Sequence, residues 1–250
     1  MQLLHIELAD KFETAGALKF ERTFSSAQCA DILLATILMA QQGENKSHGA
    51  RNLLTYPWCQ SIATQLLAHP ALHALLPQNA VAVQCNYFEK NTANNWAVAM
   101  HQDTIFPMAA RVTHPALRGW SVKHGQQFAQ APAEVLAQMV ALRLHLDHCG
   151  ETNGALRVIA GSHRRGVLSA ADIAAENATE RDAIICTADV GDVWAMRPLV
   201  LHASSRVISM AAASAMSPLE RNKRRVLHFV FGPAALPYGL SWPKFNSEVV

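Results

Sequence analysis

A histidine and an aspartate flank Gln102 in the stretch NWAVAMHQDTIF, where His101 and Asp103 are surrounded by apolar and small residues. On a β-strand, residues i and i+2 point to the same face, so the imidazole and the carboxylate would lie side by side. The flanking residues do not alternate regularly, which places the pair at a strand end or in the following loop. In either position, two such side chains can bind one metal cation.

His202, in the stretch DVWAMRPLVLHASS, is the best candidate for a third ligand. If this stretch forms one strand, His202 shares a face with every second residue, namely Trp194, Met196, Val200 and Ser204. Two neutral imidazoles and one carboxylate leave three coordination positions open, which is the facial triad of non-heme Fe(II) oxygenases. His101, Asp103 and His202 together therefore predict an iron site.

A co-substrate such as 2-oxoglutarate would chelate the iron and leave a distal carboxylate for the protein to hold. Arginine suits this task because its planar fork matches a carboxylate with two parallel hydrogen bonds. The predicted strand RRVLHFVF begins with arginines and has Arg224 and His228 on one face. In VALRLHLDH, the residues Arg143, His145 and Asp147 share a polar face opposite three leucines, which is typical of a strand lining a site or of a solvated edge strand.

The composition limits the function classes. Hydrophobic residues make up 50% of the chain and charged residues 16%, and the net charge of +2 is too small to indicate a nucleic-acid or membrane partner. The N-terminus lacks the basic segment of a signal peptide, and the apolar run ADILLATILMA is too short to span a bilayer. The five cysteines are scattered and form no C-x-x-C motif, which is typical of reduced thiols. We therefore expect a cytoplasmic protein.

The elements that position these residues change in character along the chain. The helix-like segments SSAQCADILLATILMAQQ and PWCQSIATQLLAHPALHALLP come first, and Pro70 interrupts the second. Later segments are short, rich in Val, Leu and aromatic residues, and bounded by Gly, Asn, Asp or Pro, which predicts strands. These segments are AVAVQCNYFEK, VALRLHLDH, ALRVIAG, DVWAMRPLVLH and RRVLHFVFG. We therefore predict an α+β fold with a mainly β core, a sandwich or barrel with helices on one side.

We expect one domain over residues 1–250. A helical segment would cover about residues 1–78, the β-rich core about 79–235, and a C-terminal tail about 236–250. The alanine- and serine-rich stretch SMAAASAMSPLERNKRR, near the end of this core, is typical of a surface loop or a short helix.

The ordered segments NYFEK…NWAVAMHQD, LRLHLDHCGETNGALRVIAGSH, GDVWAMRPLVLHASS and RRVLHFVF resemble the phytanoyl-CoA dioxygenase family. The resemblance runs from about Val81 to Phe231, and NGALRVIAGSH makes it more specific than H-x-D alone. The family consists of Fe(II)- and 2-oxoglutarate-dependent oxygenases built on a double-stranded β-helix (a jelly roll) with supporting helices. The resemblance implies Fe(II), 2-oxoglutarate and O2, and hydroxylation of a small molecule with release of succinate and CO2.

By position, the resemblance assigns the iron to His101, Asp103 and His202. It assigns contacts with the co-substrate to four further residues, Arg224, Ser204, Asn86 and Arg143. Halogenating relatives give up the carboxylate ligand so that chloride can bind the iron. The intact Asp103 therefore implies hydroxylation, or another oxidation without halide.

Two features depart from the family pattern. Ala160 stands where the family usually has a proline before GSH, which affects the shape of a turn. The spacing between the distal histidine and the anchoring arginine is longer than usual, because residues 209–223 form an insertion. This insertion leaves Arg206, Arg221 and Arg225 as rivals to Arg224. We prefer Arg224 because an intact strand in the right phase follows it, and Arg225 is second.

For the substrate pocket, the sequence offers Trp96, Gln102, Trp120 and His145. The segment WSVKHGQQFAQAP is expected to form a lid or cavity wall, and its polarity favours a small polar substrate. Two other function classes stay open. One is a metal-dependent, cupin-like isomerase, lyase or hydrolase without a keto acid, which would not need Arg224. The other is a non-catalytic jelly-roll binding protein.

Overall fold

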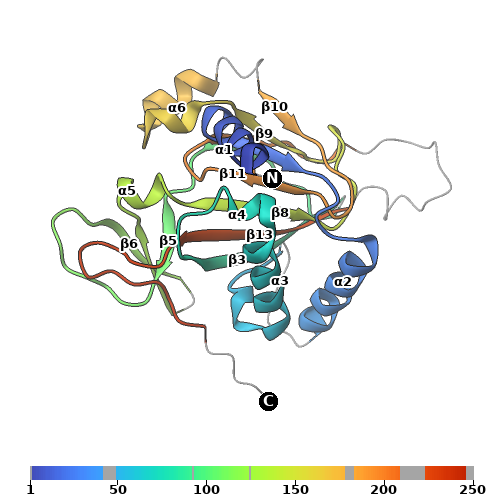
Figure 1. Cartoon of the computed structure of the whole chain (residues 1–250), viewed down its shortest axis with the longest axis horizontal. Helices are drawn as coiled ribbons and strands as arrows, with labels where there is room; N and C mark the ends of the chain where they lie inside the picture. The colour runs from blue at the N-terminus through green and yellow to red at the C-terminus, as the bar shows by residue number, and fades with distance from the viewer. Residues whose placement is uncertain are drawn as a thin grey trace.

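A sheet of antiparallel strands forms the centre of the molecule (Figure 1). The computed structural model describes residues 2–41, 49–91, 93–123, 125–177, 183–208 and 223–245. In the order of pairing, the six strands of this main sheet are β1 (Ala17–Phe20), β11 (Val193–Met196), β8 (Val140–His145), β13 (Arg224–Pro233), β3 (Ala80–Lys90) and β2 (Gly49–Ala50).

A second antiparallel sheet encloses a common core with the main sheet. Its strands, in order of pairing, are β10 (Ile184–Cys186), β9 (Leu156–Ile159), β12 (Leu201–Ser204) and β4 (Val98–His101). Val83 and Val230 of the main sheet belong to the same buried cluster as Leu156 and Val158 of the second sheet. The two sheets form the jelly roll that the sequence predicts.

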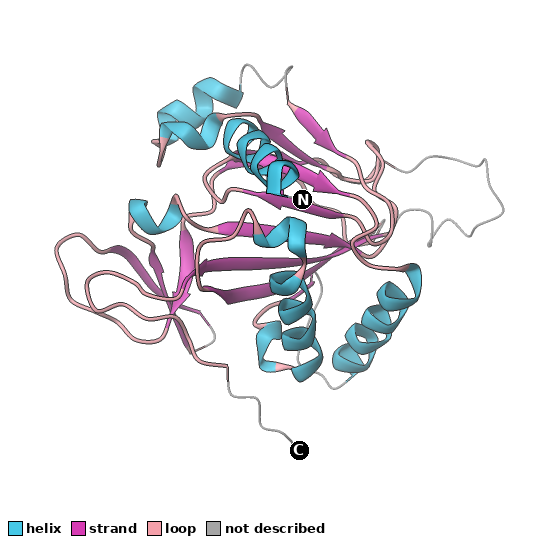
Figure 2. Ribbon diagram, viewed as in Figure 1, coloured by secondary structure: helices cyan, strands magenta, loops and turns pink. Residues whose placement is uncertain are grey.

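A smaller three-stranded sheet lies at one end of the main sheet (Figure 2). In order of pairing, its strands are β5 (Ile105–Met108), β7 (Gln126–Gln130) and β6 (Arg118–Lys123). Sequence analysis predicted no strands here, because the polar residues of β6 and β7 conceal the alternation expected of a half-buried strand.

The helices are α1 (Gln2–Ala15), α2 (Ser26–Gln41), α3 (Pro57–Ala68), α4 (Pro70–His73), α5 (Ala133–Leu136) and α6 (Ala170–Asn177), with 3₁₀ turns at Leu53–Thr55 and Ser162–Arg165. The predicted start of α2 is confirmed by a capping box, in which Ser25 and Gln28 exchange hydrogen bonds between their side chains and backbone amides. Pro70 separates α3 from α4, as predicted. Among the described helices, none has the length and apolar character needed to cross a membrane.

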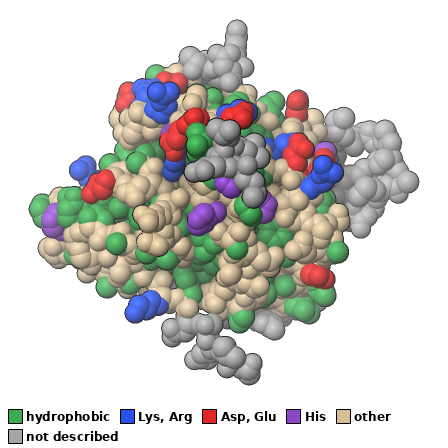
Figure 3. Space-filling model, viewed as in Figure 1, with side chains coloured by type: hydrophobic (Ala, Val, Ile, Leu, Met, Phe, Trp, Pro, Cys, Tyr) green, Lys and Arg blue, Asp and Glu red, His purple; other side chains and the backbone are tan. Residues whose placement is uncertain are grey.

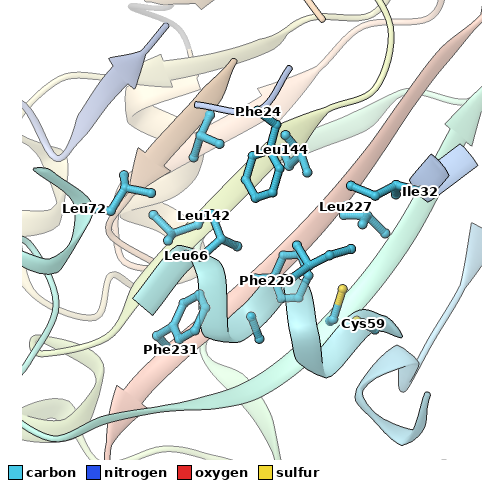
Figure 4. Packing of buried hydrophobic residues seen from close by; sticks show 14 of the residues in the cluster. Phe24, Ile32, Cys59, Leu66, Leu72, Leu142, Leu144, Leu227, Phe229 and Phe231 are labelled. Carbon is cyan, nitrogen blue, oxygen red and sulfur yellow. The ribbon is translucent and has the colours of Figure 1, made fainter. Parts of the chain in front are cut away.

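Alternation along β8 and β13 separates the two faces of the main sheet. Leu142, Leu144, Leu227 and Phe229 point to one face, where they pack with Leu66 of α3 and other helical residues (Figure 4). The intervening polar residues point to the other face, into the jelly roll. Because the apolar face is fixed by burial against the helices, the register of the polar face is fixed as well.

Two sequence predictions need correction. The segment from Asp192 to His202 is not one strand, because β11 and β12 belong to different sheets and a turn closed by the bond from Val200 N to Arg197 O separates them. The first third of the chain is not only helical, since it contributes the edge strands β1 and β2. The predicted C-terminal tail begins with residues that pack on the core, since Leu240 and Trp242 are buried.

Candidate metal centre and co-substrate pocket

His101 and His202 are direct cross-strand neighbours, at the end of β4 and in β12. Their ring centroids are 4.1 Å apart. The Nδ1 atom of each ring lies 2.8 Å from the backbone carbonyl oxygen two residues earlier, that of Ala99 or Val200. Because a carbonyl can only accept, each Nδ1 carries the proton, and each Nε2 keeps a free lone pair. This arrangement is typical of metal-binding histidines.

Asp103 completes the cluster from the loop after β4. Its Oδ1 lies 3.5 Å from Nε2 of His101, and its Oδ2 lies 3.5 Å from Nε2 of His202. The potential ligand atoms of the three residues lie within 4.8 Å of one another. Burial raises the pKa of Asp103, but the imidazoles of His202 and His101 outweigh it and lower the pKa. The site therefore brings together an ionised carboxylate and two imidazoles, the donor set of a non-heme iron centre.

Gln102, predicted to line the substrate pocket, points away from it. Its Nε2 donates to the carbonyl oxygens of Leu199 at 2.7 Å and Gly166 at 2.9 Å, and its Oε1 accepts from the amide of Leu168 at 2.8 Å. The physical reason is that these three hydrogen bonds hold its amide on the loops, while His101 and Asp103 on either side of it line the cavity. Gln102 thus fastens the ligand segment to two neighbouring loops.

One cavity of about 320 Å³ contains the three candidate metal ligands and the predicted co-substrate residues. Residues from both sheets and β5 line it: Arg51, Gln84, Asn86, Phe88, Lys90, Trp96, Val98, His101, Asp103, Ile105, Phe106, Arg143, Leu156, His202, Ala203, Ser204, Arg224, His228 and Val230. Asn86, His228 and Arg143 form one row across β3, β13 and β8. The volume is at the lower end of the range of roughly 300–1,000 Å³ for small-molecule sites.

Arg224 and Arg225 begin β13 with opposite environments. The side chain of Arg224 lines the cavity and is buried, and its Nε and Nη1 have no hydrogen-bond partner among the described residues. Burial lowers the pKa of Arg224 to about 9, with a further contribution from Arg143, so its guanidinium is still charged at neutral pH. Arg225 instead forms a two-pronged ion pair with Asp147, through Nε at 2.8 Å and Nη2 at 2.7 Å.

The other rivals for the anchoring role are placed differently. Arg206 is exposed and does not line the cavity, and Arg221 lies outside the described residues. The insertion predicted at 209–223 also lies outside them, except for its last residue. Among the arginines weighed from the sequence, Arg224 is thus the one found in the cavity wall.

Two cavity residues were missed as site residues by sequence reasoning, Lys90 and His228. Lys90 donates hydrogen bonds of 2.8 Å to Oγ of Ser204 and to the carbonyl oxygen of Ser205. Burial and the charge of Arg224 lower the pKa of Lys90 to about 7. His228 has its Nε2 3.9 Å from Oδ2 of Asp103, and burial lowers its pKa to about 3. Strand parity offered a signal, because Lys90 shares a face with Asn86 and His228 with Arg224.

Trp96 lines the cavity as predicted, but Trp120 and His145 do not. Trp120, in β6, is half-buried beneath the guanidinium of Arg111 at 5.8 Å. The described residues of the predicted lid or cavity-wall segment, which begins at Trp120, contribute to β6 and β7, and none of them lines the cavity. His145 is buried beside the cavity wall, and neither ring nitrogen has a hydrogen-bond partner among the described residues. Burial of its ring lowers the pKa of His145 well below the usual value.

Two antiparallel sheets around a two-histidine, one-carboxylate cluster define the class of jelly-roll metalloproteins. The chain belongs to the phytanoyl-CoA dioxygenase family, whose family model (Phytanoyl-CoA dioxygenase, PhyH) matches residues 12–215. Members of this family use Fe(II), 2-oxoglutarate and O2. The resemblance stated from the sequence is therefore confirmed. A comparison with curated proteins found no match.

Several solved structures share the fold. HygX from Streptomyces hygroscopicus, with nickel and 2-oxoglutarate bound, is 14% identical with a TM-score of 0.62, over 91% of this chain and 86% of that chain. SnoN, a non-heme α-ketoglutarate-dependent epimerase from nogalamycin biosynthesis, is 11% identical with a TM-score of 0.64, over 99% and 88%. SnoK, a carbocyclase from the same biosynthesis, is 13% identical with a TM-score of 0.63, over 97% and 87%. Reaction types thus differ among proteins with this fold.

Proposed function

We propose that the protein is an Fe(II)- and 2-oxoglutarate-dependent oxygenase that hydroxylates a small molecule. The observation that carries the proposal is the convergence of two kinds of site in one cavity. The three candidate metal ligands open into it, and so does the buried guanidinium of Arg224, whose Nε and Nη1 have no partner among the described residues. A metal alone would explain the first but not the second, whereas a chelating dicarboxylate explains both.

His101, Asp103 and His202 would hold the metal, because their donor atoms already face one another before any ion is bound. The backbone carbonyls at Ala99 and Val200 fix the two imidazole rings, so that little reorganisation is needed for binding. Bound there, Fe(II) and 2-oxoglutarate supply the activation of O2 for oxidation of a substrate C–H bond, with release of succinate and CO2.

Arg224 would receive the distal carboxylate of 2-oxoglutarate through its planar fork. Ser204 lies on the adjacent wall, with its hydroxyl held by Lys90, and both can donate to the same carboxylate. Asn86 and Arg143 line the cavity in the row of His228, whose Nε2 lies 3.9 Å from Oδ2 of Asp103. We assign them contacts with the remainder of the co-substrate. The apolar side chains around them exclude water and strengthen these charged contacts.

Hydroxylation is favoured by Asp103, which occupies the coordination position that halogenating relatives leave to chloride. We also propose that residues 1–250 form one catalytic domain. A cytoplasmic location is supported by the cysteines, all of which are free and buried, as expected for a reducing compartment.

The test is anaerobic addition of Fe(II) and 2-oxoglutarate to the metal-free protein, followed by visible spectroscopy. The expected result is the charge-transfer band of the chelate in the wild type and its loss in His101→Ala. Absence of the band in the wild type, or its persistence in the variant, would contradict the proposal. A cupin-like enzyme that uses no keto acid would bind the metal without giving this band, and replacement of Arg224 would leave its metal affinity and activity unchanged.

A further inference from the structure

The cavity has an excess of positive charge that the proposed co-substrate does not neutralise. Three arginines line it, Arg51, Arg143 and Arg224, and Lys90 adds a fourth positive charge when it is protonated, against the single carboxylate of Asp103. An Fe(II) ion and a 2-oxoglutarate dianion cancel each other, so the loaded cavity keeps the excess. On the face seen in Figure 3, by contrast, acidic and basic side chains are interspersed. A local excess of one sign attracts ligands of the opposite sign.

Arg51 is the cation at the rim of this cavity. It is exposed and follows β2 by one residue, and β2 pairs with β3 at Phe88 and Tyr87. Its side chain lines both the main cavity and an adjoining hollow of about 220 Å³, whose walls include Tyr87, Phe88 and Trp96. No acidic side chain of the described residues forms an ion pair with Arg51. Arg51 is therefore both exposed to solvent and part of the cavity wall.

The other cations of the cavity have defined roles within it. Arg224 and Lys90 flank the place proposed for the distal carboxylate of the co-substrate. Arg143 is buried, and its guanidinium carbon lies 5.9 Å from the ring centroid of Phe88. Arg51 is thus the cation that co-substrate binding leaves free for the primary substrate.

We propose that the primary substrate is an anionic small molecule and that Arg51 binds its carboxylate or phosphate group at the mouth of the cavity. This inference rests on the proposed function, since it concerns the space that metal and co-substrate leave. The buried excess charge favours the anion, and the fork of Arg51 gives its acidic group a fixed point. The uncharged end of the substrate then lies toward the metal.

The test uses the anaerobic protein saturated with Fe(II) and 2-oxoglutarate and three matched probe pairs. The pairs are hexanoate with hexanamide, phenylacetate with phenylacetamide, and glucose 6-phosphate with glucose. Binding is followed by the change in the charge-transfer band and, in air, by stimulated succinate formation. We expect anions to bind roughly fivefold or more tightly than their neutral partners, the scale of one partly exposed charge-assisted contact. The first two pairs report on carboxylates and the third on phosphates.

Arg51→Gln is expected to remove this preference, and Arg51→Lys to restore part of it. Arg118→Gln removes an equal charge from exposed β6, outside the cavity wall, and is expected to keep the preference. Equal binding within every pair, no binding of any anion, or an unchanged preference in Arg51→Gln would overturn the inference. So would loss of the band on adding an anion, because that anion would be displacing the co-substrate. Absence of the band in the wild type before any probe is added would instead contradict the proposed function.

Discussion

The neighbouring residues Arg224 and Arg225 give a prediction with opposite signs for two nearly identical substitutions. Arg224→Met and Arg225→Met each remove one guanidinium from the start of β13 and leave a side chain of similar length. We expect Arg225→Met to destabilise the metal-free protein and Arg224→Met to stabilise it. We also expect Arg224→Met to lose binding of 2-oxoglutarate.

The expected loss of stability in Arg225→Met follows from the ion pair that Arg225 forms with Asp147. Asp147 accepts hydrogen bonds from the backbone amide of Arg225 at 2.9 Å and from its guanidinium at 2.8 and 2.7 Å. Breaking a fully buried ion pair costs about 3–5 kcal/mol, because an uncompensated charge is left behind. The side chains are 19% and 17% exposed, and the backbone bond survives, so a loss of about 2–3 kcal/mol in unfolding free energy is expected here.

The expected gain of stability in Arg224→Met follows because the buried guanidinium of Arg224 has unpaired nitrogens among the described residues. Arg224 is 2% exposed, and two of its guanidinium nitrogens make no hydrogen bond with described residues. Arg143 adds repulsion, as its contribution to the lowered pKa of Arg224 indicates. Leaving buried polar groups unpaired costs about 1–3 kcal/mol, and an apolar side chain of similar volume removes that cost. We therefore expect unfolding free energy to rise by about 1–2 kcal/mol.

The assay is urea unfolding of the metal-free proteins, followed by titration with 2-oxoglutarate in the presence of metal. Arg225→Met should still give the chelate band under conditions where it is folded, whereas Arg224→Met should be folded and lack it. A destabilised Arg224→Met, or one that binds 2-oxoglutarate like the wild type, would refute the reasoning. The first result would make Arg224 a structural residue, and the second would remove it from the co-substrate site.

Three further predictions concern residues around the cavity. Gln102→Ala should lower metal affinity about 10- to 100-fold in a metal titration, as is usual for residues that orient ligands. The control Gln138→Ala, which breaks one exposed hydrogen bond, should leave the metal affinity unchanged. Burial lowers the pKa of Lys90 to about 7 from 10.5, so above pH 7 the unfolded chain binds more protons than the folded protein. The unfolding free energy of the metal-free wild type should therefore rise between pH 7 and 9 relative to that of Lys90→Met, as measured by urea unfolding. His145→Leu should raise the unfolding free energy by about 1–2 kcal/mol because it removes two unpaired buried nitrogens; a fall would show that His145 has a partner.

Sequence reasoning located the strands with long, regular alternation and missed those that depend on distant partners. The predicted limits of β3 coincide with Ala80–Lys90, and those of β13 differ by one residue. The short edge strands β1 and β2 exist only because β11 and β3 offer them free edges, which local patterns do not record. The contact of Lys90 with Ser204 also lies beyond local patterns, since the two residues are 114 positions apart.

The predicted strand from Asp192 to His202 was wrong at the place where the candidate metal ligands are positioned. The turn that breaks it presents three successive carbonyl oxygens, each with a donor from the ligand segments. Pro198 O accepts from the amide of Asp103 at 2.9 Å, Leu199 O from Gln102, and Val200 O from Nδ1 of His202. In an unbroken strand, backbone carbonyls would be directed to a neighbouring strand instead. The break therefore leaves these carbonyl oxygens free to accept hydrogen bonds that fix the positions of Asp103 and His202. The alternation of residues along one strand does not predict such an arrangement.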